Sequence, residues 1–460
     1  MVPLKNYSRR GFLNSIGAGM AGLYATTSGL LNPMQLFGKN TGSDYTTQVA
    51  ATFSDNYDQT VVKNKVEHLF ESLGGIDDII SPGDKVAIKI NLTGGSDTVG
   101  HENLQGVDIR EAVWTHPAVL QAVGELLIDS GISGDDIYIV EAVWDMYSYT
   151  GFGYQDVQNY LGAQFINLNE TAPYADFLNV NTGSSYFFYD HFIFNRILDE
   201  VDAFVSIPKM KHHYDAALTH GMKNLVGISP LDHYMMPDQP GWRSKLHFEG
   251  GDVGIHLPRA ICDLNMARPV NLVVNDGIKN AVGGEGPWNP TFQPAEYGLL
   301  LAGKDPVATD SIAAYVMGIN PESVEVQRPS GLYADNQLYL AKQKGLGTNL
   351  MSEIELVGDG AGSIVGINEY VAANSLKLYP NYPNPFVIST TIPFYLPEDG
   401  MVNISIINAS GRSIKTLTNR TMQAGQHEIT WNAGSVGGGM YYCRINHNGQ
   451  IQSRALVLQR

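Results

Sequence analysis

Residues 208–227 hold the densest group of ionisable side chains in the chain. Their sequence, PKMKHHYDAALTHGMKNLVG, contains three lysines and three histidines. Lysine ammonium groups attract anions, and an imidazole exchanges a proton near neutral pH. The segment therefore predicts a site for an anionic small molecule, such as a carboxylate or a phosphate. The alternative is an ordinary surface, with the lysines in solvent and the histidines bonded locally.

We expect a helix to begin near Asp215. It would place Thr219 and Lys223 on one face, because they are four residues apart, and likewise His220 and Asn224. The free N–H groups at its N-terminus would favour an anion beside the preceding lysines.

The predicted site residues fall into two groups. His213 is the acid–base candidate, and Asp276 and Asp310 would orient it or help to bind a divalent metal. The residues expected to contact the ligand are Lys89, Asn91, Lys209, Lys211, Thr219, Lys223, Asn224, Gly284 and Gly286. No serine or cysteine nucleophile motif is recognisable, so covalent acyl transfer is disfavoured.

Six of the twelve histidines lie between residues 212 and 256. Together with nearby carboxylates they offer nitrogen and oxygen donors that would suit a divalent metal, and the candidates are His213, His247 and Asp276. No HExxH pair or other tight ligand spacing is present, and scattered histidines are more often structural. The identity of any cofactor stays open.

Residues 276–287, with the sequence DGIKNAVGGEGP, form a predicted glycine-rich loop after a strand. Glycine lets a backbone approach a ligand closely, although a plain long turn explains these glycines equally well. The spacing matches neither a Walker loop nor a dinucleotide-binding fingerprint.

Strand-like and helix-like segments alternate through the middle of the chain, which predicts an α/β core with a mostly parallel sheet. The strand-like runs are residues 86–92, 136–142, 202–208, 270–276 and 298–303, and the helical patterns are residues 116–131 and 305–318. Polar residues lie at the ends of four of these strands. Lys89 and Asn91 close residues 86–92, Lys209 and Lys211 follow residues 202–208, Asp276 closes residues 270–276, and Asp305 follows residues 298–303. Ligands bind at the carboxyl ends of parallel strands, so we expect these four ends to meet at one edge.

Together these residues resemble the large family called domain of unknown function 362. The matching stretches run in order through the core: residues 89–92, 115–117, 208–227, 245–247, 263–264, 276–277, 284–287 and 298–301, with Asp305 and Asp310. Many relatives carry a ferredoxin-like cysteine cluster. This chain has two cysteines, Cys262 and Cys443, which are too few for a four-cysteine iron–sulfur cluster. The resemblance implies a domain rather than a reaction.

The formal net charge of -17 is unevenly distributed over the 460 residues. Residues 1–40 carry +4, residues 373–460 carry +4, and the middle carries -25. An acidic core argues against a general nucleic-acid binder, which needs clustered positive charge. From length and composition we divide the chain into residues 1–40, 41–360, 361–377 and 378–460.

The first 40 residues resemble an export signal. A basic stretch precedes a weakly apolar run over residues 16–31, which is short for a membrane span of about 20 residues. The sequence SRRGFL at residues 8–13 resembles a twin-arginine signal, which implies the twin-arginine translocase as a partner. We therefore expect no transmembrane segment in the mature protein. A chance arginine pair in an ordinary signal peptide is the alternative.

From about residue 378, short alternating apolar runs predict a small all-β, immunoglobulin-like sandwich. The motifs YPNPF (382–386), STTI (389–392) and GMYY (439–442), with Trp431, resemble the C-terminal sorting domain of the type IX secretion system. The resemblance implies that type IX machinery exports the protein, which is then secreted or attached to the outer cell surface. Such cargo usually crosses the inner membrane unfolded, which conflicts with a twin-arginine signal. The alternative is a generic adhesion or carbohydrate-binding module.

Two functions fit these residues. The first is an exported enzyme that acts on an anionic small molecule at the carboxyl ends of the core strands. The second is a non-catalytic cell-surface module that binds an anionic ligand or polymer, and it would need the lysines but not His213.

Overall fold

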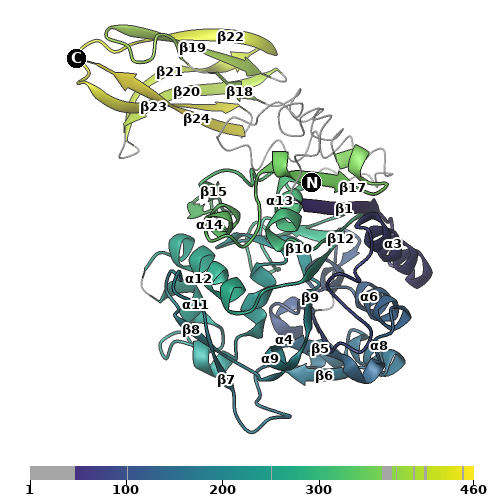
Figure 1. Cartoon of the computed structure of the whole chain (residues 1–460). Coiled ribbons are helices and arrows are strands. Elements are labelled where there is room, and N and C mark those ends of the chain that lie inside the picture. Colours follow the sequence, from purple (N-terminus) through teal and green to yellow (C-terminus); the bar gives the residue numbers. More distant parts are fainter. Residues whose placement is uncertain are drawn as a thin grey trace. The chain divides into compact units, whose positions relative to one another are not determined.

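The computed structural model describes residues 47–100, 102–249, 251–364, 376–379, 381–396, 399–408, 412–447 and 450–459. The predicted twin-arginine signal lies outside these residues, as does most of the predicted linker at 361–377. The described chain forms two compact units, one within Phe37–Ser363 and one within Ile364–Arg460 (Figure 1). Each is described separately below.

The larger unit is built on one mixed, mostly parallel sheet, as the sequence predicts (Figure 1). Its order is β17 (Ile354–Val357), β1 (Thr47–Phe53), β14 (Leu299–Gly303), β12 (Leu272–Val282), β9 (Ala203–Ser206), β2 (Val86–Lys89), β5 (Ile137–Glu141) and β6 (Gln164–Asn167). Every neighbouring pair from β12 to β6 is parallel. Only β14 runs against both of its neighbours.

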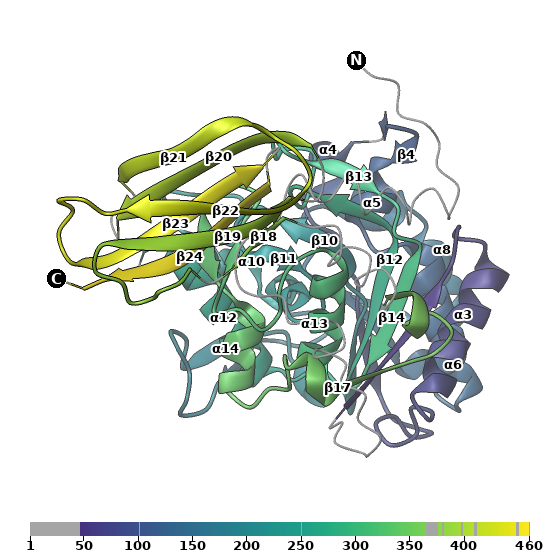
Figure 2. The same ribbon diagram turned by 90° about the horizontal axis from the view of Figure 1, so that it is seen from above.

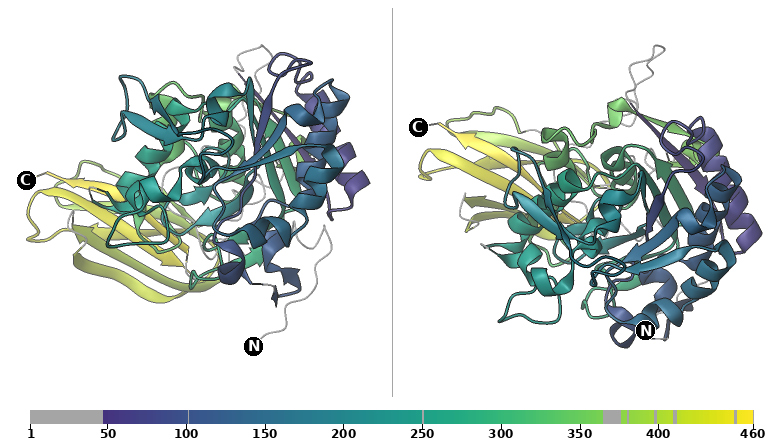
Figure 3. Two further views of the ribbon diagram at one scale, coloured as in Figure 1. Left: turned by 90° about the horizontal axis from the view of Figure 1, so that it is seen from below. Right: turned by 60° about the horizontal axis from the view of Figure 1, so that its bottom comes forward.

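Helices cover both faces of this sheet (Figures 2 and 3). On β2, Ile88 packs into one apolar cluster with α3 (Gln59–Ser72) and α6 (Pro117–Asp129), whereas Ala87 packs into another with α12 (Val253–Ala267) and α13 (Pro306–Val316). Successive strand residues point to opposite faces, so a strand with a helix layer on each side is mostly apolar on both faces. This explains the continuous apolar runs in β9 and β14.

The sheet is extended at the carboxyl end of β9. The chain continues through Ile207 and Pro208 into β10 (Lys209–His213), which pairs parallel with the second half of β12. Two short strands complete the extension: β11 (Ala217–Thr219) pairs with β10, and β13 (Gln293–Ala295) pairs with β12. The eleven-residue β12 makes this possible, because it presents free edges well beyond the end of β9.

The prediction that a helix begins near Asp215 is wrong. Asp215 lies in the turn between β10 and β11, and a 3-10 helix, η3 (Lys223–Ile228), begins only later. The backbone N–H groups of Asp215 and Ala216 both donate to His213 Nδ1 at 3.1 Å. Side-chain capping of this kind offers the backbone an alternative to a helix, and β12 supplies strand pairing that a helix would forgo.

The position expected for Asp305 is also wrong. Because β14 is antiparallel to β12, its last residue, Gly303, lies opposite Val273 near the start of β12. Asp305 therefore lies at the edge of the sheet opposite the carboxyl ends of β2, β5 and β9. There it accepts from Ala308 N and caps α13.

The smaller unit contains two antiparallel sheets. One has the order β18 (Lys377–Leu378), β19 (Ser389–Leu396) and β22 (Gly425–Asn432), and the other β21 (Ser413–Met422), β20 (Gly400–Asn408), β23 (Gly439–His447) and β24 (Gln450–Leu458). Trp431 is buried in their shared apolar core and contacts the rings of Phe386 and Tyr441. This arrangement agrees with the predicted sandwich.

Candidate functional site

Lys89 and Glu141 form a buried ion pair at the ends of β2 and β5. Lys89 Nζ lies 2.9 Å from Glu141 Oε2 and also donates to the Ile90 carbonyl at 2.7 Å. The Leu92 N–H donates to the same carboxylate oxygen. Burial lowers the pKa of Lys89, and the neighbouring Glu141 opposes that shift. Glu141 was not among the predicted site residues, although it ends one of the predicted strands.

Asn91, Lys211 and Asn224 join this ion pair in one hydrogen-bonded network. Asn91 Nδ2 donates to Asn224 Oδ1 at 3.0 Å, and Lys211 Nζ donates to Asn91 Oδ1 at 2.9 Å. Lys211 Nζ also donates to the Val113 carbonyl, and burial holds its pKa well below the ordinary value. All of these side chains are buried and bonded to one another. They form a polar layer beneath the strand ends and do not face solvent.

Lys209 and Asp276 form a second buried cluster on the neighbouring strands β10 and β12. Lys209 Nζ lies 2.9 Å from Asp276 Oδ2, and both side chains are fully buried. Tyr57 Oη donates to Asp276 Oδ1 at 2.8 Å and accepts from Lys209 Nζ at 2.6 Å. The Tyr57 ring stacks on His116, whose backbone N–H donates to Asp276. Asp276 therefore bonds Lys209 and Tyr57, and among the described residues it has no hydrogen bond to His213 that would orient the imidazole.

His213 and His247 present opposite hydrogen-bonding characters. His213 Nδ1 accepts two backbone N–H groups, so the proton of the neutral ring is on Nε2. His247 Nδ1 lies 2.9 Å from the Arg243 carbonyl, which only accepts, so Nδ1 carries the proton and Nε2 is an acceptor. The ring centroids are 6.2 Å apart. Burial lowers the pKa of both rings, to about 3 for His247, so both are neutral at physiological pH.

Lys223 begins η3, and its charge is one cause, after burial, of the lowered pKa of both imidazoles. Burial lowers the pKa of Lys223 itself to about 8, while Glu285 and Asp215 oppose that shift. Within the described residues, neither Lys223 Nζ nor the Nε2 atom of either histidine has a hydrogen bond. All three side chains are more than nine-tenths buried. The three atoms are not among the fully buried atoms that lack a partner, so they are open to a ligand or water while the rest of each side chain is packed.

Glu285 links this group to the glycine-rich loop. Its Oε2 accepts from Tyr214 N at 2.8 Å and lies 3.9 Å from His213 Nδ1, and its Oε1 accepts from Trp288 Nε1. The predicted ligand contacts Gly284 and Gly286 have another role in the structure. A Cβ atom at Gly284 would collide with Asn289, and one at Gly286 would collide with Trp288. The glycines thus make room for the loop's own side chains.

The remaining predicted residues, Asp310 and Thr219, have no hydrogen bond to these three atoms within the described part of the chain. Asp310 lies on α13, and its carboxylate accepts from Gly221 N at 2.7 Å and Met222 N at 2.8 Å. Burial raises its pKa to about 7. Among the described residues, Asp310 has no hydrogen bond or ion pair with His213. Thr219 lies opposite Lys211 on β11 and is buried.

The candidate metal ligands do not come together. Asp276 belongs to the Lys209 cluster, whereas His213 and His247 lie beside Lys223. In the part of the chain that the structure describes, no three His, Cys, Asp or Glu side chains are grouped to hold a metal ion.

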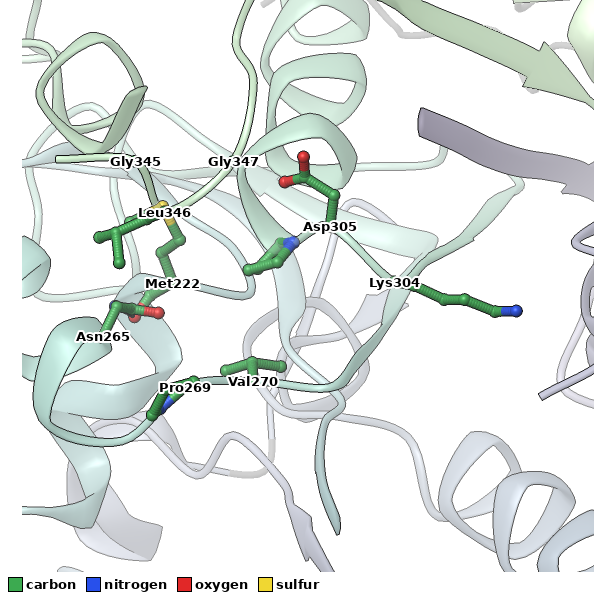
Figure 4. Close-up of a pocket in the computed structure, with 10 residues that line it drawn as sticks. Met222, Asn265, Pro269, Val270, Lys304, Asp305, Gly345, Leu346 and Gly347 are labelled. Carbon is green, nitrogen blue, oxygen red and sulfur yellow. Dashed lines mark hydrogen bonds between the residues drawn. The ribbon is translucent and has the colours of Figure 1, made fainter. Parts of the chain in front are cut away.

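A cavity of about 310 Å³ lies at the opposite edge of the sheet (Figure 4). Asp305, Asn265 and Leu346 are among its lining residues, and Lys304 points away from its centre (Figure 4). Met222 also lines it and directly precedes Lys223 in the chain. Lys223, His213 and His247 are not among its lining residues, so the cavity is separate from their unpaired atoms.

Comparisons with known proteins assign both units to families. The profile described as "Domain of unknown function (DUF362)" matches residues 86–315, and the profile described as "Secretion system C-terminal sorting domain" matches residues 380–459. A thylakoid-associated protein of Synechocystis is 26% identical over 275 residues, which cover 59% of this chain and 74% of that protein. No helix of the described residues is long and apolar enough to cross a bilayer.

Two solved structures resemble 18% of this chain. One is dimeric latent PorU from Porphyromonas gingivalis, with 21% identity and a TM-score of 0.15, and this chain covers 9% of its length. The other is a conjugative transposon lipoprotein from Bacteroides eggerthii, with 11% identity and a TM-score of 0.14, and the match covers 95% of that lipoprotein.

The sorting domain indicates that the protein is exported by the type IX secretion machinery and is then secreted or attached to the cell surface. Because the first profile spans half of the chain, from strand β2 to helix α13, the protein belongs to the DUF362 family, a domain family of unknown function.

Proposed function

We propose that this protein is an exported enzyme that acts on an anionic small molecule beside Lys223, His213 and His247. The observation that carries this proposal is the trio of unpaired polar atoms, namely the Lys223 ammonium and the two Nε2 atoms. They lie next to the carboxyl ends of β2 and β5, where α/β sheets commonly bind ligands. An anion there would satisfy the buried ammonium group.

The two imidazoles provide complementary groups for proton transfer. His213 Nε2–H is a donor, so it would stabilise negative charge that develops on the substrate. His247 Nε2 is an acceptor, and the charge of a bound anion would raise its low pKa, so it would take a proton from the substrate or from water. Lys223 would hold the acidic group of the substrate while this transfer occurs. A reaction of this type needs neither a covalent intermediate nor an oxidant.

The buried network beneath supports the positions of these groups. Asn224, one residue after Lys223, accepts from Lys89 and Asn91, which anchors η3 to the end of β2. Lys211 lies on the same strand as His213 and is tied to Asn91. Held in this way, the three unpaired atoms would keep their spacing before a ligand binds, as efficient catalysis requires.

The rival function is non-catalytic binding of an anionic ligand or polymer at the same place. That function depends on the charge of Lys223 and gives no role to the opposite hydrogen-bonding characters of His213 and His247. The complementary imidazoles therefore favour the enzyme.

The experiment compares binding with turnover in the full-length exported protein. The probes are a panel of small carboxylic acids and phosphate monoesters, with products followed by mass spectrometry and binding by calorimetry. We expect His213→Ala and His247→Ala to remove turnover and to change affinity only slightly, and Lys223→Ala to weaken binding by about tenfold or more. Matched surface controls are His191→Ala and Lys63→Ala, whose side chains pair with Asp190 and Asp129.

The outcomes separate the two functions. If Lys223→Ala weakens binding and no probe is turned over by the wild-type protein, the non-catalytic function is correct. If neither Lys223→Ala nor His213→Ala changes binding or turnover, the site has been placed wrongly.

A further inference from the structure

Arg328 is a buried arginine in the tip of a β-hairpin formed by β15 (Glu325–Gln327) and β16 (Tyr333–Asp335). The tip is closed by hydrogen bonds from Arg328 N to Leu332 O and from Gly331 N to Arg328 O. Gly331 has a φ of 82°, which the tight turn requires. The arginine side chain is only 3% exposed.

The guanidinium group of Arg328 has no hydrogen bond to any described residue. Its nearest anionic atoms are Asp215 Oδ1, 3.9 Å from Nη1, and Asp252 Oδ1, 3.9 Å from Nη2. The Asp252 oxygen already accepts from Gly254 N, where it caps α12. Arg328 Nε is fully buried without a partner. Leaving a buried N–H donor of this kind without a partner is costly.

Arg328 adjoins the group formed by Lys223, His213 and His247. Asp215 follows His213 by two residues, and the charges of both Arg328 and Lys223 lower its pKa against the effect of burial. Asp215 is therefore within electrostatic reach of both cations. The hairpin tip thus brings a second cation without a hydrogen bond to the neighbourhood of Asp215 and His213, where Lys223 also has no hydrogen-bond partner among the described residues.

We infer that Arg328 is a second anion-binding residue of this site and that the ligand carries two acidic groups. One group meets Lys223 and His213, and the other meets Arg328. The planar guanidinium suits a carboxylate or a phosphate, because two parallel N–H donors match two oxygens. The chemical class is a small dicarboxylate or a phosphorylated carboxylic acid. This inference rests on the proposed anion site and names the class of ligand that the site would prefer.

The test measures the preference for a dianion over a monoanion of the same length. The probes are succinate against butyrate and glutarate against valerate, titrated into the full-length protein by calorimetry. We expect the wild-type protein to bind each dianion about tenfold or more tightly than its monoanion partner. Arg328→Gln should remove this preference and leave monoanion affinity unchanged, and Arg328→Lys should restore part of it. Lys223→Ala should weaken both probes.

The matched control is Arg259→Gln. Arg259 lies on α12 and makes a 2.8 Å ion pair with Asp335 in the same hairpin, so its loss should leave the preference intact. A melting curve for each variant verifies folding, and Arg328→Lys keeps the charge if Arg328→Gln fails to fold.

Three results would overturn the inference: a wild-type protein without a dianion preference, an equal effect of Arg328→Gln on both probes, or no effect on either. If the Arg328 variants change nothing while Lys223→Ala still weakens binding, the second anion site is wrong and the proposed function survives. If Lys223→Ala and His213→Ala also change nothing, the proposed function itself fails.

Discussion

Lys89 Nζ lies 2.9 Å from Glu141 Oε2, at the ends of two adjacent parallel strands where neither side chain reaches solvent. The same carboxylate accepts the Leu92 N–H, and the same ammonium donates to Ile90 and Asn224. The pair therefore ties β2, β5 and η3 together beneath the unpaired atoms of Lys223 and the histidines.

The Glu141→Gln substitution should destabilise the protein strongly. It leaves the buried Lys89 ammonium without a charged partner, which typically costs about 3 to 5 kcal/mol of unfolding free energy. Urea denaturation would measure the loss. The double variant Lys89→Met with Glu141→Leu should lose less than the sum of the single variants, because no buried charge is left uncompensated. A loss below about 1 kcal/mol for Glu141→Gln, the range of an exposed pair, would contradict this.

Phosphate affinity should fall as the pH rises through about 8. Burial lowers the pKa of Lys223 to about 8, so the ammonium loses its proton in this range, although a bound anion raises the midpoint. Calorimetric titration with inorganic phosphate below and above pH 8 tests this. Lys223→Arg keeps its charge and should flatten the profile. Unchanged pH dependence in that variant would assign the titration to another group.

The lowered pKa of Lys223 also makes the free energy of unfolding depend on pH. In the unfolded chain a lysine keeps its proton up to about pH 10.4. Between pH 8 and that value the unfolded state binds more protons, so the contribution of Lys223 makes folding more favourable as the pH rises.

Ionisation of Asp310, whose carboxylate accepts from Gly221 N and Met222 N, should make the free energy of unfolding depend on pH. Burial raises its pKa to about 7, so the folded state binds more protons than the unfolded state between pH 4 and pH 7. Its contribution to stability is therefore present at low pH and is lost as the pH rises through 7. Asp310→Asn should flatten this decline in urea denaturation, whereas the surface control Asp78→Asn should not. An unchanged decline in Asp310→Asn would refute the assignment.

Removal of the sorting domain should abolish export and leave the core folded. The two units are compact, and the profile match for sorting covers only residues 380–459. A chain that ends at residue 363 should remain cell-associated in fractionation and immunoblotting, with a circular dichroism spectrum of a folded α/β protein. Fusion of residues 364–460 behind a folded reporter with its own signal peptide should direct the reporter outside. Continued export of the truncated chain would contradict this role.

Much of the fold can be predicted from local pattern. Apolar β-branched runs identify β2, β5, β9 and β14 because these strands are buried on both faces, so most of their residues are apolar. The strands of the C-terminal unit are predicted from alternating apolar and polar residues, because one face of each sheet is buried and the other is more exposed. The position of Lys89 and Asn91 at a strand end follows directly from these patterns.

Strand direction and pairing are not local properties. A run of residues such as 298–303 has the same pattern whichever way it crosses the sheet, so Asp305 was expected at the wrong edge. The local sequence pattern of the residues after Pro208 is compatible with a helix and with an extended strand. The extended solution prevails because the long β12 offers pairing and because His213 caps the turn.

The sequence by itself determined the class of each unit, the export route implied by the sorting domain, and a basic cluster at a strand end within an acidic core. Only the tertiary structure decided which of those residues are free to meet a ligand. Lys89, Lys209 and Lys211 look like Lys223 in sequence, yet packing pairs the first three internally and leaves the fourth unpaired. Arg328 contacts Asp215, two residues after His213, from more than 100 residues away, because an ion contact depends on distance in space rather than on separation along the chain.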